Sequence, residues 1–295
     1  MIIVIAGPTG VGKSKIAIEL AKKIDAEIIS ADAYQVYKEM NIGTAKVKEE
    51  ETLGVKHYMI DVYEVKENVD VKRYQEDARK ILNDLISKNK NVIICGGTGL
   101  YIKALLYDYK FYEEEENDKY KDLSLEELQK LLPLDALVDK NNKRRVVRYL
   151  EKLDSGIKTE KSSKLYDFYM IGLTKDREEI YEKINLRVEE MLKEGLIEEV
   201  KELYLKYQDA RSIISAIGYK EIISYLNNEI TLEEAIEKIK TNSRRYAKRQ
   251  YTFFNNQFDT KWIKKDDKTE EKKKEIEYEF SDNGVMVLEV WENEK

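Results

Sequence analysis

The chain contains 295 residues, of which 42% are hydrophobic and 37% are charged, and its formal net charge is −6. This length is sufficient for one α/β core and a second, helical part. No apolar run approaches the roughly 18 residues of a membrane span, and the acidic balance argues against a strongly basic nucleic-acid binder. The single cysteine, Cys95, excludes an internal disulfide and favours a reducing, cytoplasmic environment.

The N-terminal segment predicts a strand, a tight turn and a helix. Residues 1–6 read MIIVIA, an apolar and β-branched run, and the apolar spacing of residues 16–21 indicates a helix. Because the strand begins at once, we expect no secretory or transit peptide. The turn matches the pattern G-x-x-x-x-G-K-[ST], with Gly7, Pro8, Thr9, Gly10, Val11, Gly12, Lys13 and Ser14.

In this strand–turn–helix context, the motif predicts a binding site for a di- or triphosphate chain. Its glycines allow backbone N–H groups to point inward, and the N-terminus of the following helix adds its dipole. Lys13 can reach the outer phosphates, and the Ser14 hydroxyl suits a Mg²⁺ ion held between phosphate oxygens. The motif does not identify the molecule that carries the phosphates.

Strands and helices alternate along the first 175 residues, which predicts a P-loop NTPase-like α/β fold with a parallel sheet flanked by helices. Further strands are expected at residues 26–30, 57–61, 91–95 and 168–173, and helices at residues 71–88 and 100–106. Capping boxes at Ser124–Glu127 and Thr231–Glu234 predict later helices.

The composition changes along the chain and predicts four parts. The apolar segment 285–291 predicts a small appended strand behind a mixed-charge linker. The expected parts are an α/β core at 1–110 and 141–175, a short helical insertion at 111–140, a helical part at 176–263, and a charged linker and tail at 264–295.

Asp32 is the first carboxylate after the second expected strand, at the sheet edge where ligands bind in open α/β folds. We interpret it as a general base or a metal-linked acid beside the phosphate site; the alternative is a cap for the following helix. His57 begins an expected strand, which favours a structural role over a catalytic one. Cys95 lies in an expected buried strand and is interpreted as a core thiol, and the two residues do not make a zinc site.

Two stretches concentrate positive charge in this acidic chain. The segment from Thr241 to Tyr251 has four positive charges, no negative one and interleaved tyrosines. Guanidinium groups beside aromatic rings suit RNA phosphates and stacking on unpaired bases, whereas the alternative is an ordinary solvated helix face. The first stretch contains Arg144, Arg145 and Arg148, and the second contains Arg244, Arg245, Lys248 and Arg249.

Taken together, these segments resemble the tRNA dimethylallyltransferase (tRNA isopentenyltransferase) family of bacterial type. The P-loop alone indicates a superfamily, but its combination with D-x-x-Q-x-Y at 32–37 and G-T-A-K at 43–46 is far more specific. The resemblance spans roughly residues 1–263. Its other segments lie at 96–101, 144–148, 171–177, 187–191, 195–200, 217–219 and 247–250.

The resemblance implies transfer of a dimethylallyl group from its diphosphate to N6 of the adenosine just 3′ of a tRNA anticodon, with release of diphosphate. It implies that the P-loop holds the diphosphate with Mg²⁺ on Ser14, that Arg187 closes over this group, and that Asp32 is the base. The catalytic residues would be Asp32, Lys13 and Arg187. The implied tRNA contacts are Asp32, Ala33, Tyr34, Gln35, Thr98, Arg144, Arg145, Arg148, Arg245, Lys248 and Arg249.

Three other hypotheses share parts of this pattern. A P-loop small-molecule kinase needs the same loop and a nearby acid, but not the basic stretch at 244–249. An adenylate prenyltransferase that uses free nucleotide predicts a reduced C-terminal half. A nucleotide-gated RNA-binding protein would perform no chemistry. If the resemblance to the tRNA dimethylallyltransferases holds, we expect this protein to be a monomer that binds tRNA through the anticodon stem-loop and has no membrane partner.

Overall fold

The computed structural model describes residues 1–111, 118–136, 138–155, 163–264, 276–280 and 286–290. It divides into two compact units, one formed by Met1–Ile102 with the described residues from Asp167 onward, and one formed by Lys103–Tyr166. In these described ranges, no helix combines the length and the apolar character that crossing a membrane requires.

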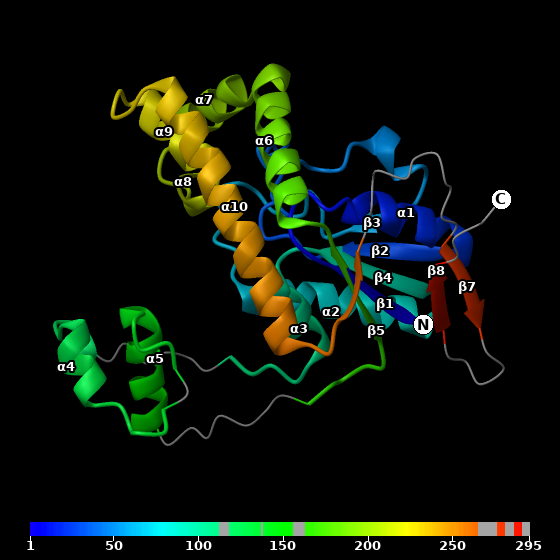
Figure 1. The fold of residues 1–295 in the computed structure, drawn as a ribbon, viewed down its shortest axis with the longest axis horizontal. Coiled ribbons are helices and arrows are strands. Elements are labelled where there is room, and N and C mark those ends of the chain that lie inside the picture. The colour runs from blue at the N-terminus through cyan, green and yellow to red at the C-terminus, as the bar shows by residue number, and fades with distance from the viewer. Residues whose placement is uncertain (112–117, 137, 156–162, 265–275, 281–285, 291–295) are drawn as a thin grey trace. The chain divides into compact units, whose positions relative to one another are not determined.

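A parallel sheet forms the centre of the first unit, with its described strands in the order β3-β2-β4-β1-β5-β6 (Figure 1). Every residue of the first strand is buried, as expected for a parallel sheet that is covered on both faces. The strands are β1 (Ile2–Ala6), β2 (Ala26–Ser30), β3 (His57–Tyr58), β4 (Asn91–Gly96), β5 (Tyr169–Thr174) and β6 (Lys261–Lys264).

The connections between these strands confirm the expected α/β alternation. Apolar positions of α1 pack with the strands in one core cluster, which includes Leu20, Ile28 and Ile93. Asp70 caps α2 by accepting a hydrogen bond from the Arg73 amide at 2.8 Å. These elements are α1 (Lys13–Ile24), the 3-10 helix η1 (Glu49–Thr52), α2 (Val71–Ser87) and α3 (Gly99–Leu106).

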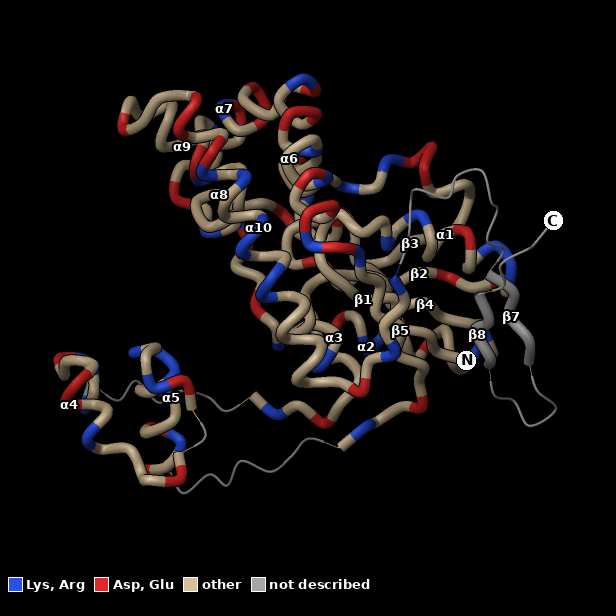
Figure 2. Tube along the Cα trace, viewed as in Figure 1, with Lys and Arg blue, Asp and Glu red and all other residues tan. Residues whose placement is uncertain are grey.

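The C-terminal half is helical up to residue 257, and α6 and α10 pack against each other. Gly195 ends α6 at φ 103°, and the Thr231 capping box begins α10 as expected. Figure 2 shows positively charged positions along α10 and on the α5 helix of the second unit. The helices are α6 (Arg177–Glu194), α7 (Leu196–Tyr207), α8 (Arg211–Ser215), α9 (Tyr219–Leu226) and α10 (Leu232–Gln257).

The second unit contains η2 (Asp118–Tyr120), α4 (Leu125–Lys130) and α5 (Lys143–Asp154). Its small core joins Leu128 of α4 to Val146 and Leu150 of α5. The basic helix α5 therefore groups with the insertion, whereas the sequence placed it in the α/β core at 141–175. The reason is that the apolar face of α5 is buried against α4.

The C-terminal boundary also differs from the expectation. β6 pairs in parallel with β5, so the main sheet gains a strand from residues placed at the end of the helical part. β7 (Ile276–Phe280) and β8 (Met286–Val290) form an antiparallel pair, which includes the expected strand near residue 288. Residues 265–275 of the expected linker lie outside the described residues.

Candidate active site

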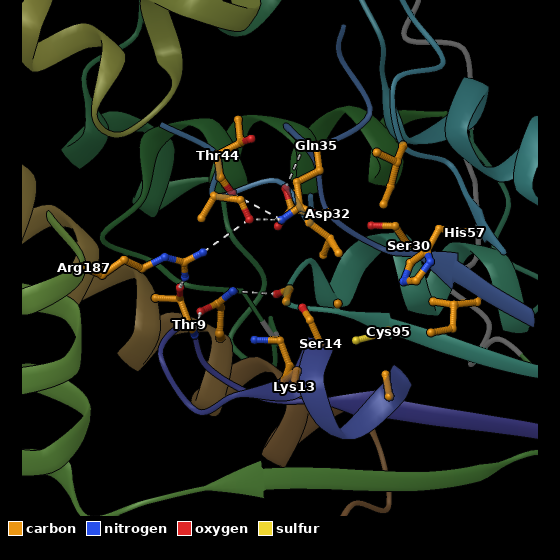
Figure 3. Close-up of a pocket in the computed structure, with 18 of the residues that line it drawn as sticks. Thr9, Lys13, Ser14, Ser30, Asp32, Gln35, Thr44, His57, Cys95 and Arg187 are labelled. Atoms are coloured by element: carbon orange, nitrogen blue, oxygen red, sulfur yellow. Dashed lines mark hydrogen bonds between the residues drawn. The ribbon is translucent and has the colours of Figure 1, made fainter. Parts of the chain in front are cut away.

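The P-loop occupies the turn between β1 and α1, at the carboxyl edge of the sheet. Gly7, Gly10 and Gly12 adopt φ values of 145°, 87° and 85°, which a side chain would disfavour. α1 begins directly after this turn, at Lys13. Thr9, Lys13 and Ser14 line a cavity of about 110 Å³ (Figure 3). The turn and the helix N-terminus lie at one cavity, an arrangement that suits an anion.

Lys13 supplies a positive charge inside this cavity. Its Nζ donates to the Pro8 carbonyl oxygen at 2.8 Å, and among the described residues it forms no ion pair. Burial lowers the pKa of Lys13 to about 8; Arg187 lowers it further, whereas Cys95 and Asp32 act in the opposite direction. A buried ammonium without a carboxylate partner is suited to an anionic ligand.

Arg187 approaches the P-loop from α6 and joins it to the G-T-A-K loop. One guanidinium nitrogen donates to Thr9 Oγ1 at 3.1 Å, and the other donates to the Ala45 carbonyl oxygen at 3.5 Å. Burial lowers the pKa of the guanidinium, although an arginine remains protonated in proteins. Arg187 and Lys13 therefore place two positive charges at one cavity, as Figure 3 shows.

The two oxygens of the Asp32 carboxylate have different surroundings. Its Oδ1 accepts hydrogen bonds from the amides of Tyr34 at 2.9 Å and Gln35 at 3.2 Å, so the carboxylate caps the turn that follows β2. No donor from the described residues is bonded to Oδ2. One oxygen thus fixes the side chain, and the other is available to a ligand in the cavity that Asp32 lines.

Neighbouring loops hold this turn in place. The Gln35 side-chain amide donates to the carbonyl oxygens of Thr44 and Ala45, each at 3.2 Å. Thr98 Oγ1 accepts from the Ala33 amide at 3.1 Å, and the Tyr246 hydroxyl lies close to Thr98. Burial raises the pKa of Tyr246 to about 12, so this hydroxyl keeps its proton.

His57 and Cys95 also line the phosphate-site cavity (Figure 3). The His57 ring bonds through Nδ1 to the Val55 carbonyl oxygen at 2.8 Å, and burial lowers the pKa of the imidazole. Burial raises the pKa of the Cys95 thiol to about 11, so the sulfur is protonated at neutral pH. The lowered pKa of His57 favours the uncharged imidazole, so neither residue adds a charge to the cavity.

A second cavity of about 380 Å³ adjoins the first and is formed mainly by the helical part. Arg245, Tyr246 and Arg249 reach it from α10, and Tyr34 and Asp32 reach it from the turn after β2. Both cavities are lined by Thr9, Asp32, Thr44, Arg187 and Tyr246. Two ligands, one in each cavity, would therefore meet beside the Asp32 carboxylate.

The basic residues predicted to contact RNA fall into three places. Arg245 and Arg249 line the second cavity, whereas Lys248 lies on another face of α10 and lines a separate cavity with Arg177 and Tyr181. The expected contacts Arg144, Arg145 and Arg148 are exposed positions of α5, within the second unit.

Three residues that organise the site were not among those predicted. Gln250 bonds the P-loop, Glu199 bonds the loop that begins at Asn41, and Tyr246 lines both cavities. The role of Gln250 could have been found from the sequence, because the residue lies at helical spacing from Ala247 and Phe254, on the buried face of α10. A glutamine on an apolar stripe requires a buried partner.

The donor set fits a Mg²⁺ ion that is bound largely by a ligand's phosphates. Among the described residues, no group of three or more His, Cys, Asp or Glu is placed to hold a metal alone. The exposed Ser14 hydroxyl lines the cavity beside the phosphate-binding turn. Mg²⁺ commonly takes one or two protein oxygens and completes its shell with water and phosphate oxygens.

The fold and the two joined cavities define a P-loop-type enzyme in which a carboxylate lies between an anion site and a larger pocket. The family model described as IPP transferase matches residues 35–257. The chain therefore belongs to this family of tRNA-modifying prenyltransferases, the tRNA dimethylallyltransferases.

Relatives match the chain along most of its length. It is 44% identical to a tRNA dimethylallyltransferase of Anoxybacillus flavithermus, over 91% of each chain, and 45% identical to one of Bacillus mycoides, over 88% of each. A tRNA isopentenylpyrophosphate transferase structure from Bacillus halodurans superimposes with a TM-score of 0.72 at 38% identity, covering 91% of this chain and 92% of that one. A eukaryotic dimethylallyltransferase acting on tRNA gives a TM-score of 0.76 at 27% identity, covering 91% and 75%.

Proposed function

We propose that this chain transfers a dimethylallyl group from dimethylallyl diphosphate to N6 of the adenosine just 3′ of the anticodon in tRNA, releasing diphosphate. The observation that carries the proposal is the junction of an anion cavity and a larger pocket at Asp32. A kinase also needs a pocket for its phosphate acceptor, so the lining of the second cavity is what favours a prenyltransferase. The second cavity has the basic and aromatic lining that suits an unpaired nucleotide.

The donor's diphosphate would lie against the P-loop amides, Lys13 and Arg187. These groups face the leaving group, on which negative charge grows as the bond from C1 of the dimethylallyl group to oxygen breaks. Their positions are set before the substrate arrives, because Lys13 and Arg187 are already bonded to the surrounding loops. Such preorganised charge lowers the barrier to departure of the diphosphate.

Asp32 would accept the proton that the adenine amine loses. N6 attacks C1 of the donor, the new C–N bond replaces the bond from C1 to oxygen, and one proton leaves N6 for Oδ2 of Asp32. The fixed Oδ1 keeps the carboxylate in place during this step, since it remains bonded to the amides of Tyr34 and Gln35. The exocyclic amine is a poor nucleophile, so proton removal during attack is a productive role for this base.

The protein is proposed to use Mg²⁺ at Ser14. When bound, the ion supplies positive charge that neutralises the diphosphate oxygens. The hydroxyl of Ser14 is the protein oxygen available beside the P-loop, and the remaining ligands would come from diphosphate and water.

The acceptor would be an anticodon stem-loop whose target base has left the stack, since an adenine within a stack does not present N6 to a carboxylate inside a cavity. Arg245 and Arg249 would hold the RNA backbone near the second cavity, with Tyr34 and Tyr246 beside the base. The exposed arginines of α5 would give a further backbone contact. The enzyme is proposed to act as a cytoplasmic monomer.

A single-turnover assay tests the proposal. Protein, Mg²⁺, labelled dimethylallyl diphosphate and unmodified anticodon stem-loop RNA are mixed, and label on the RNA is counted. Parallel reactions contain AMP as the acceptor or ATP as the possible phosphate donor. We expect label on the stem-loop adenosine alone. Label on AMP would replace the proposal with an adenylate prenyltransferase, and phosphate transfer from ATP without prenyl transfer would replace it with a kinase.

A further inference from the structure

Gln250 connects two loops of the active site through the two ends of its side-chain amide. Its Oε1 accepts a hydrogen bond from the Thr9 amide at 2.9 Å, and its Nε2 donates to the Gly97 carbonyl oxygen at 3.0 Å. The side chain is only 5% exposed. It thus reaches from α10 to the P-loop and to the turn after β4, which are 241 and 153 residues away in sequence.

The structure around Gln250 leaves room for this side chain and for little else. A Cβ atom at position 97 would lie 2.1 Å from Gln250 Nε2, so the glycine allows the amide to enter. On the other side, Thr9 is held twice: its amide by Gln250 of α10 and its hydroxyl by Arg187 of α6. Two helices from the C-terminal half therefore determine where one P-loop residue lies.

The helix that carries Gln250 also lines the pocket for the second ligand. Arg245, Tyr246 and Arg249 face that pocket within the two preceding turns of α10. The P-loop and the RNA-facing helix are thus joined by one buried amide. Donor binding depends on the direction of the P-loop N–H groups, because an amide donor weakens steeply when it is misaligned.

We propose that Gln250 is a positioning residue for the diphosphate: it fixes the Thr9 segment of the P-loop against the Gly97 turn and so sets the affinity for the donor. It lines the phosphate-site cavity, and its side-chain amide is bonded to Thr9 and Gly97. The identity of the donor rests on the proposed function, but the effect on diphosphate affinity does not. Removal of the amide should release the P-loop and leave the RNA-facing residues of α10 in place.

The test measures binding of inorganic diphosphate with Mg²⁺ by titration calorimetry, together with KM for each substrate. Gln250→Met keeps the side-chain volume and removes both hydrogen bonds. We expect its Kd for diphosphate and its KM for the donor to rise about tenfold, with KM for RNA within about twofold of wild type. Gln257→Met, the same change at an exposed position of α10, should leave all of these values unchanged.

A second variant tests the same contact from the opposite side. Gly97→Ala places a methyl group where the amide lies, and it should raise Kd for diphosphate to a similar extent. The double variant should bind no more weakly than either single one, since all three lack the same bridge. This shared, non-additive loss separates positioning through one contact from general destabilisation, which melting temperatures follow independently.

Unchanged diphosphate affinity in a folded Gln250→Met protein would overturn the inference, as would an equal loss of RNA affinity. If this variant does not fold, Gly97→Ala decides the question, because it keeps Gln250 in the chain. A wild-type protein that binds diphosphate but transfers no prenyl group would refute the proposed function alone. In that case, the effect of Gln250 on diphosphate binding would still be measurable.

Discussion

The two cavities of the active site are built in different ways. The phosphate-binding turn is a run of eight consecutive residues within one strand–turn–helix unit, and its Thr9, Lys13 and Ser14 line the first cavity. The second cavity collects side chains from α6, α9 and α10 and from two loops of the sheet edge. The turn is therefore encoded locally, whereas the second cavity exists only after the C-terminal helices have packed. Asp32 lines both cavities, and variants at the two sites should separate their functions.

The largest effect is expected at Asp32, where the two cavities meet. Asp32→Asn keeps an oxygen that can accept from the amides of Tyr34 and Gln35, so the turn should survive. It removes the proton acceptor, and kcat should fall by about 100- to 10,000-fold. Single-turnover rates and RNA binding by gel shift measure the two effects separately. Substantial prenyl transfer by this variant would exclude Asp32 as the base.

A smaller effect, confined to the donor side, is expected at Lys13. Lys13→Met removes a charge that faces the diphosphate, and kcat/KM for the donor should fall by about 100-fold, while Kd for RNA changes little. Lys22→Met, at an exposed position near the end of α1, is the matched control and should behave as wild type. Equal losses of donor and RNA binding would show that the two cavities are not functionally separate.

The pH dependence of donor binding should also distinguish the two cavities, because Lys13 lines only the first. Because its pKa is about 8 in the free protein, Lys13 is protonated below pH 8 and loses its charge above it. We expect kcat/KM for the donor to fall above pH 8, by at most about tenfold per pH unit. The RNA Kd should remain level, since arginines stay charged throughout this range. If Lys13→Met retains the same alkaline limb, another group is responsible for it.

The difference between the cavities also explains what could be predicted from the sequence. The P-loop, Asp32 and the strands from β1 to β5 depend on local patterns, namely glycine spacing, buried apolar runs and caps. The pairing of β6 with β5 and the packing of α5 against α4 depend on contacts between distant segments. A single sequence records the apolar face of α5 but not the element that covers it.

Glu199 makes contacts between segments that are distant in the sequence. Its Oε2 accepts from the amides of Asn41 at 3.0 Å and Ile42 at 2.8 Å, and its Oε1 accepts from the Gly43 amide at 3.1 Å and the Tyr219 hydroxyl at 2.6 Å. One carboxylate on α7 thereby holds the start of the G-T-A-K loop. The chain separation of more than 150 residues hides this role from sequence patterns.

The smallest effect on catalysis is expected at this carboxylate, because it acts on a loop rather than on a ligand. Glu199→Ala leaves three backbone amides without their acceptor, and the free energy of unfolding should fall by about 2 kcal/mol, as urea denaturation would measure. KM for RNA should rise a few-fold, since Gly43 and Thr44 line the second cavity. Glu198→Ala, at the exposed neighbouring position, is the control. A variant as stable as wild type would mean that water replaces the carboxylate, and that the loop keeps its shape without help from α7.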